Sequence, residues 1–184
     1  SGKALILKEI KRFTGSAMYM LNGGMGTILL IIVAVMLIVK KDVIFRVASA
    51  YGLTGISAAS IISMGLCVCE SMNLISASSI SLEAKTMWLI KSLPIDTGTL
   101  LMSKALCHFI FGAAGAVIAA ITACVILKAS AAEAVGMFVL PIVFSAFTAL
   151  CGILINLHMP KFDWINEVSC VKQSGSVMVS MLIN

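Results

Sequence analysis

Charged residues are scarce in this sequence. Asp, Glu, Lys and Arg make up 11% of its 184 residues, whereas they make up about 25% of a soluble globular domain. So few charges cannot cover the surface of a water-soluble protein of this length. Hydrophobic residues make up 60% of the chain, and its mean hydropathy is +1.10. We therefore predict an all-α fold, a polytopic bundle of transmembrane helices, because a helix satisfies its own backbone hydrogen bonds in lipid.

The motifs of common hydrolases and metal sites are absent from the sequence. It has only two histidines, no H-E-x-x-H zinc motif and no G-x-S-x-G nucleophile turn. Five of the six cysteines lie inside apolar runs, and Cys67 and Cys69 lack the spacing of a zinc or redox motif. We expect no catalytic residue, no metal and no cofactor in this chain, so we do not predict an enzyme. An intramembrane hydrolase that uses Glu70 and His108 is a remote alternative.

The net charge of +5 raises the question of nucleic-acid binding. The basic residues lie at the edges of the apolar runs, which is where Lys and Arg contact anionic lipid headgroups. We therefore expect membrane lipids as partners and no nucleic acid.

Apolar runs long enough to cross a membrane, which takes about 20 residues, recur four times along the chain. They cover residues of about 17–39, 47–75, 100–127 and 134–157. A further span begins near residue 171 and is cut short by the end of the chain. We expect residues 1–184 to be one partial transmembrane domain from a longer protein.

A short amphipathic helix is predicted at 3–13, before the first span. Apolar and basic side chains recur on different faces of this helix, so it is expected to lie in the membrane interface with its cations toward the headgroups. The alternative is that it extends the first span. The apolar face holds Ile6, Ile10 and Phe13, and the basic face holds Lys8, Lys11 and Arg12.

The distribution of Lys and Arg predicts a cytoplasmic N-terminus. With that orientation the segments on the cytoplasmic side carry nine of these residues and the outer segments carry four. Short cytoplasmic loops of membrane proteins are enriched in Lys and Arg.

The loop at 78–99, between the second and third spans, carries the most local information. Its residues predict a short amphipathic helix that is N-capped by Ser81, has Glu83 in its first turn and is stopped by Pro94. Asp96 is placed to cap the third span. With Trp88 exposed on it, this helix can rest on lipid or dock into the groove of a partner. Its apolar face is predicted to hold Leu82, Leu89 and Leu93.

The same loop resembles a known family. Residues 79–95 read Ser-Ile-Ser-Leu-Glu-Ala-Lys-Thr-Met-Trp-Leu-Ile-Lys-Ser-Leu-Pro-Ile, which looks like the signature loop of bacterial ATP-binding-cassette type-2 permeases of a Firmicutes-like branch. The resemblance extends to Lys-Glu-Ile-Lys-Arg-Phe at 8–13, Tyr-Met-Leu-Asn at 19–22, the segment 156–167 and Lys-Gln-Ser at 172–174. The loop departs from the family pattern at Ala84, where glycine is common.

This resemblance implies the permease subunit of an ATP-driven exporter in the bacterial cell membrane. The loop at 78–99 would then be a cytoplasmic coupling helix against a separate ATPase subunit, which holds ATP and Mg because this sequence has no G-x-x-x-x-G-K-[ST] motif. A second permease half or a second copy would complete the transporter. A membrane assembly or sensor subunit is the alternative function. The residues that the resemblance assigns to ATPase coupling are Leu82, Glu83, Lys85, Trp88 and Leu89.

Two ionisable residues lie within the predicted spans. Glu70 is about 8 Å inside the end of the second span at 1.5 Å per residue, so we expect it to reach the cytoplasmic headgroups, with a place in a transport pathway as the alternative. We expect His108 to bond a neighbouring helix, with a pathway role as its alternative.

Overall fold

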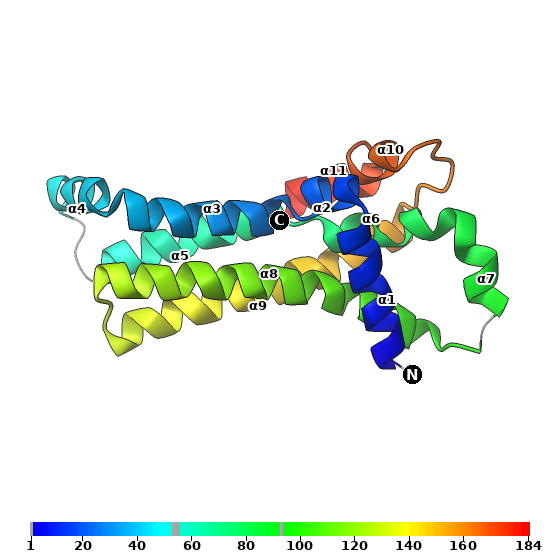
Figure 1. Cartoon of the computed structure of the whole chain (residues 1–184), viewed down its shortest axis with the longest axis horizontal. Coiled ribbons are helices and arrows are strands. Elements are labelled where there is room, and N and C mark those ends of the chain that lie inside the picture. The colour runs from blue at the N-terminus through cyan, green and yellow to red at the C-terminus, as the bar shows by residue number, and fades with distance from the viewer. Residues whose placement is uncertain (1, 53–55, 93) are drawn as a thin grey trace.

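The computed structural model describes residues 2–52, 56–92 and 94–184, and every regular element within these ranges is a helix (Figure 1). By length and composition, three helical stretches in the described chain can cross a membrane, or four if one bent pair counts as a span. The predicted all-α, multi-span membrane fold is confirmed. The longer stretches are Ala58–Ile90, Thr97–Leu127 and Ala131–His158, and the bent pair is Ala17–Gly23 with Met25–Val39.

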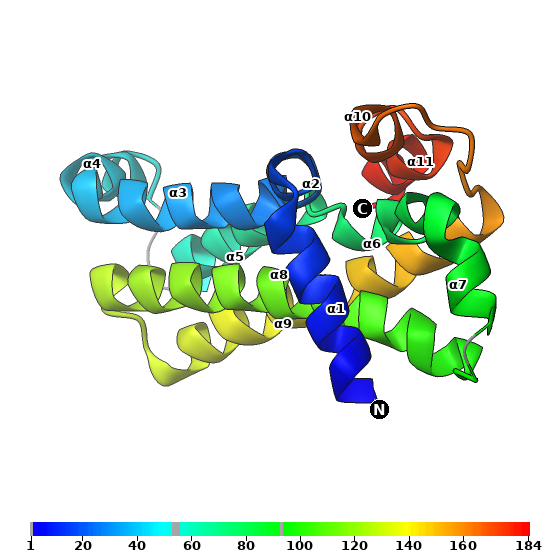
Figure 2. The ribbon, with the colours of Figure 1, turned by 45° about the vertical axis from the view of Figure 1, so that its right-hand side comes forward.

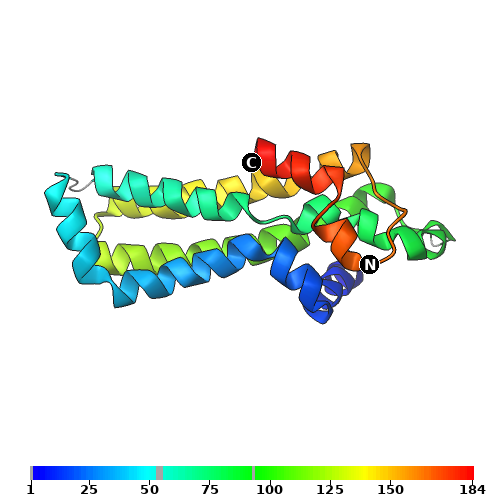
Figure 3. The ribbon, with the colours of Figure 1, turned by 90° about the horizontal axis from the view of Figure 1, so that it is seen from above.

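Four helices run alongside one another and form the bundle (Figures 1 and 3). They are α3 (Met25–Val39), α5 (Ile56–Ser71), α8 (Thr97–Leu127) and α9 (Ala131–His158). Small side chains on α8 let the neighbouring backbones approach closely, as is common where helices pack in lipid. Those that are fully buried in the central apolar cluster are Ala116, Ala119, Ala120 and Ala123.

The two ends of the bundle differ. One end, which we call the far end, carries α4 (Lys41–Ala50) and the tight turn between α8 and α9 (Figure 1). In that turn Lys128 adopts a left-handed conformation with φ of 50°, and Ser130 and Glu133 form a capping box at the start of α9. The opposite end, which we call the loop end, carries the loop at 78–99 and the N-terminal helix.

The predicted span at 17–39 is divided in two. Helix α2 (Ala17–Gly23) and helix α3 meet at Gly24 with a bend of 67°. A Cβ atom added at Gly24 would lie 2.8 Å from the carbonyl oxygen of Met20 and 2.8 Å from the ring of Phe13. The bend therefore brings the backbone at Gly24 against a side chain of the N-terminal helix, which only glycine permits.

The predicted span at 47–75 is also divided among several helices. Its first residues belong to α4, residues 53–55 lie outside the described part of the chain, and α5 ends at Ser71. After the break, α6 (Ile75–Ser79) begins. Backbone groups at the break form hydrogen bonds with neighbouring segments. The amide of Leu74 donates to the carbonyl of Gly23 (2.7 Å), and the side chain of Asn73 accepts from the amide of Thr27 (2.9 Å).

The remaining predicted elements have close counterparts. The spans at 100–127 and 134–157 correspond to α8 and α9, and Asp96 caps α8 by accepting from the amide of Thr99 (2.9 Å). The helix at 3–13 corresponds to α1 (Gly2–Gly15), which crosses α8 at a steep angle (Figure 2). Beyond residue 166 the chain forms α10 (Glu167–Val171) and α11 (Gly175–Ile183).

Candidate functional site

The loop at 78–99 consists of two short helices instead of one. A 3-10 helix, η1 (Ser81–Thr86), is followed by α7 (Met87–Ser92). The prediction that Ser81 is an N-cap is wrong, because Ile80 has helical φ and ψ of −76° and −46° and the chain runs from α6 directly into η1. The helix has no free first turn at Ser81 for a side chain to cap. Leu93 lies outside the described residues.

Asn156 of α9 fixes the start of η1. Its Oδ1 accepts from the backbone amides of Ile80 (2.9 Å) and Ser81 (3.2 Å), and its Nδ2 donates to Oγ of Ser81 (2.7 Å) and Oγ of Ser176 (3.0 Å). The indole of Trp164 donates to the carbonyl of Ser81 (2.8 Å). The inner half of the loop is therefore attached to α9 and to the segment that follows α9, and Asn156 also connects α9 to α11.

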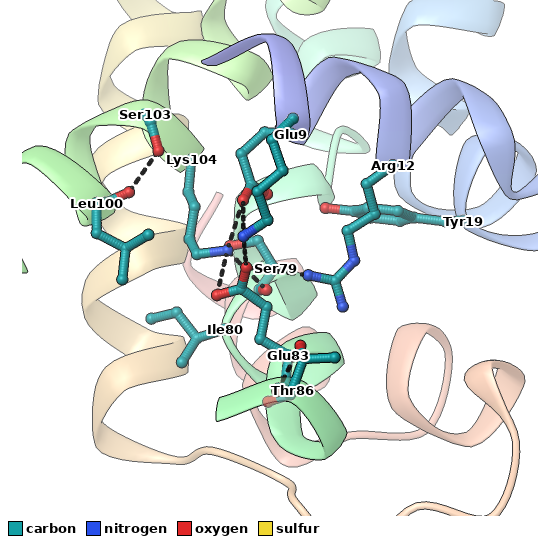
Figure 4. A network of polar contacts seen from close by, with 12 residues as sticks. Glu9, Arg12, Tyr19, Ser79, Ile80, Glu83, Thr86, Leu100, Ser103 and Lys104 are labelled. Atoms are coloured by element: carbon teal, nitrogen blue, oxygen red, sulfur yellow. Dashed lines mark hydrogen bonds and ion pairs between the residues drawn. The ribbon is translucent and has the colours of Figure 1, made fainter. Parts of the chain in front are cut away.

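Glu83 lies in a buried charge cluster (Figure 4). Its Oε2 lies 2.8 Å from Nζ of Lys104, and its Oε1 lies 3.2 Å from Nη1 of Arg12 and contacts Nζ of Lys8. Nζ of Lys104 also lies 3.1 Å from Oε1 of Glu9. Glu9, Glu83 and Lys104 are each 3% exposed or less. This charge cluster of five residues joins α1, η1 and α8.

The charge cluster corrects the predicted orientation of α1. Its basic side chains were expected to face lipid headgroups, but Lys8 and Arg12 point to Glu83. A carboxylate in the protein interior is costly unless cations and hydrogen bonds compensate it. The two carboxylates of the cluster face three cations, so both charges are compensated. Lys11 is exposed, and Lys8 is partly exposed as well, with 42% of its side chain accessible.

The five residues assigned to ATPase coupling divide between the inside and the outside of the protein. Leu82 is 4% exposed and packs in an apolar cluster with Phe13, and Glu83 lies in the charge cluster. Trp88 is 71% exposed and Leu89 is 46% exposed, both on α7. Leu82 and Leu89 therefore do not share one apolar face. Their positions follow from the change of helix type after residue 86, which turns α7 away from the bundle.

Lys85 lies at the boundary between the two halves of the loop. Its Nζ is 4.3 Å from the centre of the Trp164 ring, a favourable cation–π distance. Figure 1 shows α7 extending beyond the bundle at the loop end. The loop is thus fixed at its inner half and exposed at its tip.

Glu70 corrects a second prediction. It was expected to reach the headgroups, but it is 0% exposed. Nδ2 of Asn73 donates to its Oε2 (2.8 Å), while its Oε1 faces Gly112 and Ser145. A Cβ atom added at Gly112 would lie 2.0 Å from Oε1 of Glu70 and 2.4 Å from Oγ of Ser145. The carboxyl group is therefore enclosed by three helices and lies in the interior of the bundle, and its place in a transport pathway stays a prediction.

His108 bonds neighbouring helices, as expected. Its Nδ1 lies 2.9 Å from Oγ of Ser76 and accepts from the Ser76 amide (3.3 Å), while its Nε2 lies 3.3 Å from Oγ1 of Thr148. Because the amide must donate, Nδ1 carries no hydrogen, and Nε2–H donates to Thr148. His108 is 0% exposed.

Glu70 and His108 belong to one line of polar side chains inside the bundle, which we call the buried polar seam. His108 and Gly112 are one turn apart on α8, and Ser145 and Thr148 are one turn apart on α9, so each helix presents its polar positions to the same line. The seam has six residues from four helices and the break between two of them: Glu70, Asn73, Ser76, His108, Ser145 and Thr148.

Four charged or amide residues of these networks were not singled out from the sequence as site residues. They are Glu9, Asn73, Lys104 and Asn156, each 3% exposed or less. Lys104 and Asn156 had a usable signal, since a charged or amide side chain inside an apolar run is costly in lipid and commonly faces a bundle interior. Glu9 had no such signal, because it lies in a charged helix.

The described residues contain no group of three or more His, Cys, Asp or Glu that could hold a metal ion. No curated protein and no solved structure matches the chain significantly. A family described as membrane proteins of 12 transmembrane segments matches residues 18–183. The chain therefore belongs to this family of multi-span membrane proteins.

Proposed function

We propose that this chain is a membrane-spanning part of an ATP-driven exporter in a bacterial cell membrane, and that a separate ATPase moves it through the loop at 78–99. The observation that carries the proposal is the construction of that loop. Its inner half is bonded to the bundle, and its tip on α7 exposes Trp88. Large exposed aromatic side chains commonly anchor protein interfaces.

The attachments of the loop give it a mechanical role. A force applied to α7 passes to η1, where Glu83 is paired with Lys104 of α8 and Ser81 is bonded to Asn156 of α9. Movement of the loop therefore changes the packing of α8 against α9. Such a change can alternate the access of the bundle between the two membrane faces, and the family resemblance of residues 79–95 supports this role.

The proposal assigns partners and orientation. The N-terminus and the loop end face the cytoplasm, where the ATPase holds ATP and Mg. The family has 12 transmembrane segments, and the described residues contain three or four candidate spans. A second permease half or a second copy of the chain supplies further spans of the transporter.

The test is recovery of an ATPase with the protein. The tagged full-length protein is purified from its native membrane, and ATP-binding subunits that accompany it are quantified by photolabelling with an azido-ATP probe. Truncation of a well-buried interface aromatic costs about 2 kcal/mol, which is roughly a thirty-fold loss of affinity. Trp88→Ala should therefore recover far less ATPase at equal membrane expression.

Tyr51→Ala is the matched control. Tyr51 is 78% exposed and precedes the start of α5 at the far end, so its truncation should leave ATPase recovery unchanged. Equal recovery by wild type and Trp88→Ala contradicts the coupling role. Recovery of an ATPase whose hydrolysis drives no transport in liposomes would favour the alternative of an assembly or sensor subunit.

A further inference from the structure

We propose that Glu70 is a proton-binding site inside the bundle, loaded and unloaded from the loop end through His108 and Thr148. This inference concerns the bundle alone and does not depend on an ATPase partner. It extends the proposed function by naming an ion, the proton, that the bundle binds.

The first argument is the environment of the carboxyl group. In the described part of the chain, no Lys, Arg or His nitrogen lies within ion-pair distance of Glu70, whereas Glu9 and Glu83 both pair with cations. An unpaired carboxylate at 0% exposure in a membrane span is strongly unfavourable, and binding a proton removes its charge. The uncharged carboxylic acid also gains a donor that an ionised group lacks.

The second argument is the position that this donor would occupy. Oε1 of Glu70 and Oγ of Ser145 face each other beside Gly112, and no hydrogen bond of ordinary geometry satisfies either atom among the described residues. A proton on Oε1 can be donated to Oγ of Ser145 after a small rotation. A bound proton therefore lets Glu70 donate in this contact, in addition to the hydrogen that the Ser145 hydroxyl can itself donate.

The groups that face Glu70 come from every helix packed around it. Asn73, which donates to Glu70, and the nearby thiols of Cys67 and Cys69 belong to the same stretch of chain. Thr27 of α3 donates to Asn73, and Ser145 of α9 lies beside Oε1 of Glu70. His108 on α8 is the one ring base of the seam. None of these side chains is a permanent cation, so none can replace the proton as the partner of the carboxylate.

The third argument is the route. On the far side of Glu70 the bundle is closed by a buried apolar cluster. That cluster includes Leu30, Ala34, Leu37, Leu66, Ala119 and Met137. Toward the loop end the interior is polar instead, from Thr148 and His108 to Ser76 and then Ser79, whose carbonyl accepts from Lys104 (3.2 Å). The polar side chains therefore favour the loop end as the side from which a proton reaches Glu70.

The proton balance of this route is simple. Loading delivers one proton to Nδ1 of His108 from the side of Ser76, and Nε2 releases its proton to the hydroxyl of Thr148. The Thr148 hydroxyl donates to the backbone carbonyl of Ser145 (3.1 Å), so it must first rotate toward Oγ of Ser145. The two hydroxyls then pass one proton to Oε1 of Glu70, whose charge changes from −1 to 0. Hydroxyl and imidazole groups can do this because each both donates and accepts hydrogen bonds. Unloading along the same route restores the starting tautomer of His108.

The first experiment asks whether Glu70 holds a proton. The purified full-length chain in liposomes at neutral pH is examined by infrared spectroscopy for the C=O stretch of a protonated carboxyl group. The band should be present in the wild type, shifted in Glu70→Asp and lost in Glu70→Gln. Ser63→Ala removes a buried hydroxyl of α5 outside the seam and should leave the band unchanged. Absence of the band in the wild type, or its persistence in Glu70→Gln, overturns the proposal.

The second experiment tests the route. After rapid mixing with D2O, the rate at which this band shifts reports exchange of the Glu70 proton. A positioned proton-transfer group typically contributes 10²–10⁴-fold in rate, so Thr148→Val, which has the same shape without the hydroxyl, should exchange roughly a hundredfold more slowly. Thr148→Ser keeps the hydroxyl and should exchange as the wild type does. Exchange in Thr148→Val at the wild-type rate overturns the route.

Discussion

Nζ of Lys104 lies 2.8 Å from Oε2 of Glu83, and each residue is 1% exposed, although 20 residues of sequence lie between them. One belongs to the loop at 78–99 and the other to the first turns of α8. The pair therefore fixes the inner half of the loop directly to the longest helix of the bundle. A loop held in this way cannot move independently of α8.

Lys104→Met should destabilise the protein by about 1–3 kcal/mol, because the two carboxylates lose their most buried cation while Lys8 and Arg12 still pair with the cluster. The measurement is equilibrium unfolding of the purified protein in mixed detergent micelles, followed by circular dichroism. The double variant Lys104→Met, Glu83→Gln should lose less than the sum of the two single variants, because the residues are in contact. Additive losses would show that the pair is not coupled.

Gly112→Ala should destabilise the bundle and disturb Glu70. The added Cβ would lie 2.0 Å from Oε1 of Glu70, and overpacking of a filled interior typically costs about 1–3 kcal/mol. Gly65→Ala is the matched control, since a Cβ at this exposed position of α5 meets nothing within 4 Å. The control should be neutral or slightly stabilising because alanine favours helix. Unfolding curves of both variants check the prediction, and equal stability of the two would contradict the observed packing at Gly112.

The sequence predicts the class of this fold well because the class depends on local composition. Long apolar runs and helix caps such as Asp96 act within a few residues, so α8 and α9 were predicted with nearly their observed ends. The breaks at Gly24 and after Ser71 were missed for a physical reason. Each break is stabilised by a hydrogen bond or a close contact with a distant segment, such as the bond from Leu74 to Gly23.

The same distinction explains the site. Trp88 was expected to be exposed and is exposed, because α7 ends before Pro94 and extends away from the bundle. Glu83 was assigned to a surface that contacts a partner, yet it is buried. It pairs with Lys8, which lies 75 positions before it, and with Lys104, which lies 21 positions after it. Its role depends on pairing across the fold, which spacing within the loop cannot show.

The proposed orientation makes an opposite prediction for each end of the bundle. Asp163 is exposed in the segment after α9 at the loop end, and Tyr51 is exposed at the far end. In a variant without its natural cysteines, a cysteine at Asp163 should react with an impermeant maleimide only after the membrane is opened. A cysteine at Tyr51 should react in intact cells. Cys170, the natural cysteine nearest to Asp163 in the sequence, is fully buried, and burial raises the pKa of its thiol to about 11, so it contributes little background even where it is retained. Labelling of Asp163→Cys in intact cells would reverse the orientation and place the loop at 78–99 on the side of the membrane that lacks ATP.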